Sequence, residues 1–161
     1  MPSTYTPIAT YTVSSAQTSY TFTSIPSTYT DLILVGSAAT NTNVDIWLRF
    51  NGDSASTNYS RTFVYGDGSS ALSGRTSNAS NIGAAYGSTS SSTFVIQLMN
   101  YSNTTTYKSL ISRYGPSNVV SVGLVGLWRS TAAINQIEIS CNGSDTMSAG
   151  STLTLYGILA A

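Results

Sequence analysis

Apolar and polar residues alternate with a period of two along most of this chain. In the segment 44–50, valine, isoleucine, leucine and phenylalanine occupy the even positions, with polar residues or tryptophan between them. A β-strand turns successive side chains to opposite faces, so this alternation predicts strands. No segment shows the spacing of three to four residues that marks an amphipathic helix. We predict strands near residues 7–13, 18–23, 31–38, 44–50, 61–65, 93–100, 107–114, 119–129, 134–141 and 152–159.

Short sequences rich in Gly, Asn and Asp separate these segments. Examples are Asn51-Gly52-Asp53 and Asn142-Gly143-Ser144, which have the composition of tight turns. The stretch 66–92 differs, because it is rich in Gly, Ser, Asn and Ala over a much longer span. We predict that 66–92 is a long, loosely structured loop inserted between two strands.

The number and spacing of the strands predict an all-β fold. Eight to ten short strands fit a two-sheet antiparallel sandwich or a barrel, and the last eight match the strand count of a jelly roll. A chain of 161 residues is long enough to bury a core in one domain without a disulfide or a metal. We therefore predict a single domain over residues 1–161, built as a two-sheet sandwich with jelly-roll topology.

Three predicted strands are apolar on both faces, namely 32–35, 94–99 and 119–128. A sandwich strand needs only one apolar face, the one turned to the core. The other face has to be covered by a loop, by an N-terminal strand or by another subunit, because large apolar patches are rare on monomers. Among these alternatives we favour another subunit.

The strand near 119–129 illustrates the problem. Its even-numbered residues, from Val120 to Trp128, share one face, and only one face can point into the core. The opposite face and the end of this strand supply the candidate interface residues, although Trp128 is also in phase with the core positions. These candidates are Val119, Val125, Leu127, Trp128 and Arg129.

The composition argues against catalysis. The chain has no His, and its six acidic residues are scattered, so groups that transfer protons are scarce. Asp45 and Glu138 resemble a glycosidase pair only superficially, because their place among alternating apolar residues favours ion pairs with arginines such as Arg49 or Arg129. Lys108 is the one base left for a serine nucleophile, and we expect it to be a solvated strand residue. We predict no catalytic residue, no cofactor and no metal site.

Charge and hydropathy also limit the partners. The six Lys and Arg residues are isolated from one another, whereas nucleic-acid binding needs clustered cations. No apolar stretch approaches the 18 residues of a membrane span. We predict neither a nucleic-acid nor a membrane partner. Cys141, the one cysteine, is in phase with Ile137 and Ile139, so we expect a buried core thiol.

Four segments resemble a β-rich structural module of tailed-bacteriophage virion proteins. They are Phe22–Leu32, Leu48–Asp53, Gly126–Ile134 and Ala149–Ile158. The resemblance extends from about residue 8 to residue 158, and it preserves the order and approximate spacing of the segments. In that family these stretches are turns, strand starts and the final strand, so no catalytic motif carries over.

The resemblance implies a place on the virion exterior. A tail fibre usually has an attachment segment or shaft before such a module, whereas here the module begins within about seven residues of Met1. We therefore expect a capsid cement or decoration protein, a homotrimer that binds the major capsid protein on the outer capsid surface and is made in the host cytoplasm. The alternative is a receptor-binding, carbohydrate-binding module of a head or tail fibre. An enzyme that degrades surface polysaccharide is third.

Overall fold

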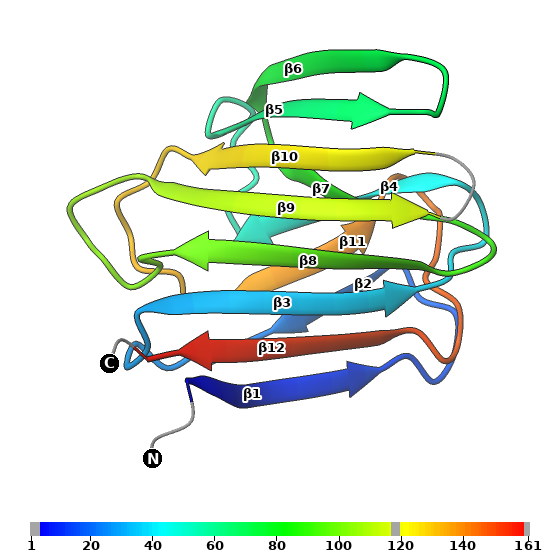
Figure 1. Ribbon diagram of the computed structural model, residues 1–161. Helices are drawn as coiled ribbons and strands as arrows, with labels where there is room; N and C mark the ends of the chain where they lie inside the picture. Colours follow the sequence, from blue (N-terminus) through cyan, green and yellow to red (C-terminus); the bar gives the residue numbers. More distant parts are fainter. Residues whose placement is uncertain (1–3, 117–119, 160–161) are drawn as a thin grey trace.

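The computed structural model describes residues 4–116 and 120–159, which form 12 strands in two antiparallel sheets (Figure 1). The prediction of an all-β sandwich is confirmed. Most of the predicted strands are present within a few residues of their expected bounds. No helix in the described part of the chain is long and apolar enough to cross a membrane.

The larger sheet has eight strands and the smaller sheet has four. From edge to edge, the larger sheet contains β1 (Tyr5–Thr12), β12 (Thr152–Ile158), β3 (Asp31–Ala38), β8 (Ser92–Met99), β9 (Lys108–Pro116), β10 (Ser121–Trp128), β5 (Tyr59–Gly66) and β6 (Ala71–Ala79). The smaller sheet contains β2 (Ser19–Phe22), β11 (Ile137–Cys141), β4 (Val44–Phe50) and β7 (Ile82–Gly87).

Along the chain, strands of the larger sheet and strands of the smaller sheet follow one another in turn. Strands β1, β3, β8 and β12 lie together in the larger sheet, and β2, β4, β7 and β11 make up the smaller one. The remaining strands are two antiparallel pairs, β5 with β6 and β9 with β10, which complete the larger sheet. Strands β9, β10 and β5 contact β7 of the smaller sheet, and β6 is the outermost strand of the larger one (Figure 1). The jelly-roll topology stays a prediction.

The prediction of a long loop at 66–92 is wrong. This segment contains all of β6 and β7, and β8 begins at its end. Strand β6 forms because its backbone pairs with β5 across a tight turn, although most of its small side chains are exposed. Strand β7 forms because its small residues, among them Ala84 and Ala85, fit into the core. Gly, Ser and Ala have low strand propensity, so composition alone concealed both strands.

The core lies between the sheets and follows the predicted alternation. The even positions of β4 are buried, from Val44 to Phe50, and the odd ones are partly exposed. The even positions of β10 are likewise buried, including Leu124 at 3% exposed. Cys141 is buried as expected, and burial raises the pKa of its thiol to about 11.

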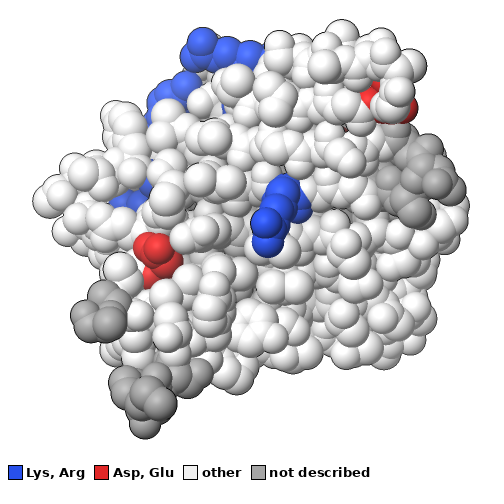
Figure 2. All heavy atoms as spheres, viewed as in Figure 1, with Lys and Arg blue, Asp and Glu red and all other residues white. Residues whose placement is uncertain are grey.

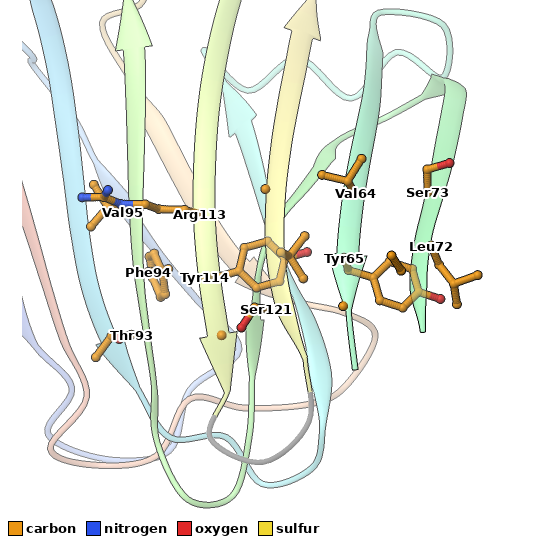
Figure 3. Close-up of a pocket in the computed structure, with 15 residues that line it drawn as sticks. Val64, Tyr65, Leu72, Ser73, Thr93, Phe94, Val95, Arg113, Tyr114 and Ser121 are labelled. Atoms are coloured by element: carbon orange, nitrogen blue, oxygen red, sulfur yellow. The ribbon is translucent and has the colours of Figure 1, made fainter. Parts of the chain in front are cut away.

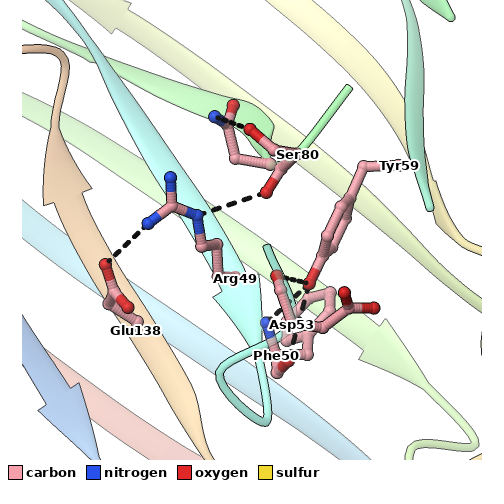
Figure 4. Close-up of polar contacts among 7 residues, drawn as sticks. Arg49, Phe50, Asp53, Tyr59, Ser80 and Glu138 are labelled. Atoms are coloured by element: carbon pink, nitrogen blue, oxygen red, sulfur yellow. Dashed lines mark hydrogen bonds and ion pairs between the residues drawn. The ribbon is translucent and has the colours of Figure 1, made fainter. Parts of the chain in front are cut away.

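Three large aromatic residues fill the end of the core beside the 51–58 loop. The ring centroids of Phe50 and Trp128 are 5.5 Å apart, and those of Tyr59 and Trp128 are 6.3 Å apart. Tyr59 is fully buried, and its hydroxyl donates to the carbonyl of Asp53 at 3.0 Å (Figure 4). Burial raises the pKa of this phenol to about 12. The cluster therefore attaches the loop to the core.

The Asp53 carboxylate holds the same loop from its other side. Its Oδ2 atom accepts hydrogen bonds from Trp128 Nε1 at 2.7 Å and from Asn58 Nδ2 at 2.8 Å. Its Oδ1 atom accepts from the Ala55 amide at 2.9 Å. Burial raises the pKa of Asp53, but these three hydrogen bonds outweigh burial and leave the pKa below its usual value.

A polar clamp joins the two sheets at the edge strand β7. Arg61, from β5, donates through Nη1 to the carbonyl of Gly83 at 2.5 Å and through Nη2 to Asp45 Oδ2 at 3.0 Å. A Cβ added at Gly83 would overlap the Arg61 guanidinium. The missing side chain of Gly83 is what lets the arginine reach across β7.

We predict that Asp53→Asn weakens the dependence of stability on acid. Because the folded pKa is lowered, the ionised carboxylate stabilises the fold above its unfolded pKa of about 3.9, and this contribution is lost as the pH falls through the folded value. Thermal midpoints of the variant should be lower at pH 7 and should change less than those of the wild type below about pH 4.

Asp67→Asn is the matched control for Asp53→Asn. Asp67 also accepts turn hydrogen bonds, from the Ser69 and Ser70 amides, but it is exposed and has no bond to a core side chain. Asp67→Asn should therefore lower the thermal midpoint at pH 7 by less than Asp53→Asn does. Equal losses for the two variants would contradict the role given to the Trp128–Asp53 bond.

We predict that Gly83→Ala destabilises the protein by displacing Arg61, at a cost of about 1–3 kcal/mol. The same change in an Arg61→Ala background should cost much less, because the overlapping group is gone. Urea unfolding of the four proteins in this cycle measures the coupling, which we expect to exceed about 1 kcal/mol. Additive losses would show that Arg61 is not the group displaced.

Candidate functional site

The candidate site is the outer face of the larger sheet, which points away from the smaller sheet. Strand register aligns its outward residues in rows across the strands. In one row Val125 of β10 lies opposite Thr62 of β5 and Ile111 of β9. Ile111 in turn pairs with Gln97, and Gln97 with Ile33. The neighbouring row crosses the strands from Ser73 through Val64, Gly123, Arg113 and Val95 to Val35.

Several apolar side chains on this face are open to solvent. The exposed fraction is 60% for Val64, 54% for Val125, 48% for Ile111 and 39% for Val35. Single exposed apolar residues are common, but here they recur on four strands of one sheet. A surface of this kind usually marks a contact with another macromolecule.

Two of the three expected covers do not lie over this face. The N-terminal strand β1 pairs edge to edge with β12, so it extends the sheet and does not cover it. The 66–92 segment supplies β6 to the edge of the larger sheet and β7 to the smaller sheet, so it does not cover the face either. Figure 1 shows no described segment crossing the front of the larger sheet. The described part of the chain therefore leaves this face uncovered.

The face carries very little charge. Figure 2 shows it almost free of charged side chains, with isolated basic and acidic groups. Arg113 lies in the middle of a row, and Arg75 lies on the edge strand β6. Asp31, at the start of β3, is engaged by the Asn100 amide at 2.7 Å. Contacts made by such a face depend on shape and apolar area more than on ion pairs.

A hollow of about 840 Å³ lies on this face. It is lined by three consecutive residues on each of five strands, so two outward rows form its sides and the backbone of the row between them forms its floor. None of the lining residues belongs to the smaller sheet. Many of its outward positions hold glycine, alanine or serine, which are too small to fill the hollow. They are Gly66, Ala71, Gly115, Ser121 and Gly123.

Larger side chains border the hollow. Val64 of β5 lies at one end of the hollow, and Arg113 of β9 and Val95 of β8 lie toward the other. Figure 3 shows Arg113 extending from β9 across β8 beside Val95. Thr93 and Ser121 add hydroxyl groups to the lining. The hollow therefore combines an apolar border with one guanidinium and a few hydroxyls.

The structure separates the predicted interface residues into two groups. Val125 and Leu127 belong to the outward rows of β10, and Leu127 is half-buried. Arg129 is tied to the start of β5, because it donates to the Thr57 carbonyl at 2.9 Å and to Ser60 Oγ at 3.1 Å. Val119 lies outside the described residues.

Trp128 is not available to a partner, which corrects its inclusion among the interface candidates. It is 2% exposed, and its indole packs on Phe50 and Tyr59 inside the sandwich. Its one polar atom already donates to Asp53. The alternation of β10 places it inward with Leu124, as its phase in the sequence allowed.

The two candidate carboxylates are both engaged in ion pairs. Glu138 lies 3.5 Å from Arg49, as predicted, and Arg49 also donates to the Ser80 carbonyl at 3.2 Å (Figure 4). Asp45 pairs with Arg61, not with Arg49 or Arg129. Sequence gave no sign of this partner, because it comes from a strand of the other sheet.

Lys108 is buried, so the expectation of a solvated strand residue is wrong. It is 2% exposed, and its ammonium donates to the carbonyls of Thr106 at 2.7 Å and Thr131 at 3.2 Å. Burial lowers its pKa. The position is inward by strand alternation, and the carbonyls of two loops replace the water that the ammonium loses.

Sequence reasoning missed most of the outward face. Val64 and Ile111 lie in predicted strands, but the sequence does not mark them as parts of one surface, because it does not show which residues are their neighbours across strands. The pairing of Val125 with Ile111 is what joins them into one surface. The signal that identifies them is an apolar residue at an outward-facing position of a predicted strand.

The chain matches no known protein-family model, and no curated protein is detectably similar to it in sequence.

Proposed function

We propose that this protein is a non-enzymatic binding module that docks through the outer face of its larger sheet, and that it acts as a cement or decoration protein on a phage capsid. The observation that carries the proposal is the open, nearly uncharged apolar face that includes Val64, Val125, Ile111 and Val35. The resemblance of four segments to virion proteins supplies the setting.

Docking through this face is consistent with its physical properties. Full burial of a Val or Ile side chain stabilises a contact by about 1.5–3 kcal/mol, and four such residues are exposed on this one sheet face. A surface with few charges loses little affinity when salt screens electrostatic attraction. Many weak contacts of this kind, repeated over a symmetric shell, would hold capsomers together.

The partners in this proposal are the major capsid protein and further copies of the chain. A symmetric homo-oligomer, with a homotrimer as the expected form, would bury part of the outer face and leave the rest for the shell. Val125 and Leu127 are the residues we assign to such contacts, since they point outward from β10. The site of action is then the outer surface of the virion.

A carbohydrate-binding module of a head or tail fibre is the second candidate, and the hollow is the observation that favours it. Its volume is typical of ligand sites, and Arg113, Thr93 and Ser121 offer polar groups. Sugar sites usually also present an aromatic ring, and none of the outward residues that line the hollow is aromatic. The capsid proposal therefore ranks first. Copy number separates the two, since a decoration protein is present in hundreds of copies per particle and a fibre in far fewer.

We predict that phage particles lacking this protein assemble but rupture at a lower temperature than complete particles. Adding back purified wild-type protein should restore the rupture temperature, because each bound copy adds contacts that must break first. Val125→Asp should bind such particles at least about tenfold more weakly, since a carboxylate would lose its water in the apolar contact.

Thr104→Asp is the matched control, because it adds the same charge on an exposed loop away from the sheet face. It should bind and protect particles as the wild type does. Thermal unfolding of both purified variants shows whether they remain folded. Equal rupture temperatures with and without the protein, together with lost adsorption to the host, would favour the fibre candidate.

A further inference from the structure

The four outer edges of the two sheets differ in how well they are closed. An edge strand presents unpaired backbone N–H and C=O groups that can pair with another chain, so soluble proteins usually block it. Strand β1 is blocked by Pro7, which has no N–H, and by an irregularity in its pairing between Pro7 and Ala9. Strand β2 is only four residues long.

Side chains of the larger sheet close the edge strand β7. Its carbonyls at Gly83, Ala84 and Tyr86 accept hydrogen bonds from Arg61, Ser112 and Ser92, in that order. A further strand added beside β7 would have to break these bonds. Three of the four edges therefore resist pairing.

Strand β6 has no such protection. It spans Ala71–Ala79, contains no proline, and its side chains are almost all exposed. Its only charge is Arg75. It projects beyond the smaller sheet at the rim of the molecule, and no described residue lies along its outer edge in Figure 1. This leaves one long sheet edge open.

The hairpin geometry shows which backbone groups face outward from β6. Asp67 N–H donates to the Ser70 carbonyl at 3.3 Å, so these two residues form the bonded pair that closes the turn. Bonded and non-bonded pairs alternate along an antiparallel ladder. Leu72 therefore exchanges bonds with Tyr65 of β5, whereas Ser73, opposite Val64, turns its N–H and C=O to the free edge. Ala71 and Arg75 do the same.

We propose that β6 is a docking edge, and that it pairs antiparallel with β6 of a second copy of this chain to form a two-fold dimer. A two-fold pair closes both open edges at once, and association through edges then stops because the other edges are blocked. The small side chains of β6 leave the approach clear. With the two-fold axis near Ser73, Arg75 lies opposite Ala71 of the partner subunit, so the two arginines do not face each other.

Ser73→Pro tests this proposal, with Ser73→Thr as its matched control. Proline removes the outward N–H and places its ring at the free edge, while the β5–β6 bonds at Leu72 and Gly74 stay intact. Threonine retains the N–H. We expect the solution mass of the proline variant, measured by sedimentation equilibrium at micromolar concentrations, to be half that of the threonine variant. Equal masses, or a monomeric wild type, would overturn the proposal.

Ser73→Lys and amide exchange keep the test decisive if the proline variant does not fold. The lysine variant retains every backbone bond but adds a positive charge near Arg75 on both copies, so it should dissociate at lower dilution than the threonine variant. In the wild type, the amides of Ser73 and Arg75 should exchange more slowly as protein concentration rises. Exchange at these amides that is independent of concentration would overturn the proposal. These measurements use the purified protein alone, so they do not depend on whether it binds capsids.

Discussion

Antiparallel backbone pairing in the eight-stranded sheet is the constraint on which the rest of the structure depends. Once the register is set, every strand must place alternate residues on opposite faces. The same pairing that turns Leu124 and Trp128 into the core turns Val125 outward beside Ile111. The outer apolar face is thus a direct consequence of the register that builds the core.

Polar groups in this protein mainly fix one segment to another. Asp53 joins the 51–58 loop to Trp128, and Arg61 joins the larger sheet to the edge of the smaller one. Lys108 ties two loops through their carbonyls. With only 7% charged residues, the chain spends most of its few charges on internal links, which leaves the large sheet face nearly neutral.

Low charge and open sheet surfaces both favour association between copies of this protein. Few charges mean weak long-range repulsion between copies, so unprotected edges and apolar faces are free to make contacts. The blocked edges at β1 and β7 limit where such contacts form. Strand β6 and the outer-face residues Val64, Val125 and Ile111 lie in the β9–β10 and β5–β6 part of the sheet, and Val35 extends the outer face to β3.

The sequence by itself determined the all-β class, most of the strands and the core side of each. Residues such as Val44 and Leu48 indicate a strand, because burial of one face requires apolar residues at alternate positions. It did not reveal β6 or β7, whose small residues form strands only because a neighbouring backbone pairs with them. Tertiary structure alone decided three features: the Asp45–Arg61 ion pair, the burial of Lys108 and the pairing of Val125 with Ile111. Each depends on which distant strands lie side by side, and the local pattern of residues does not contain that information.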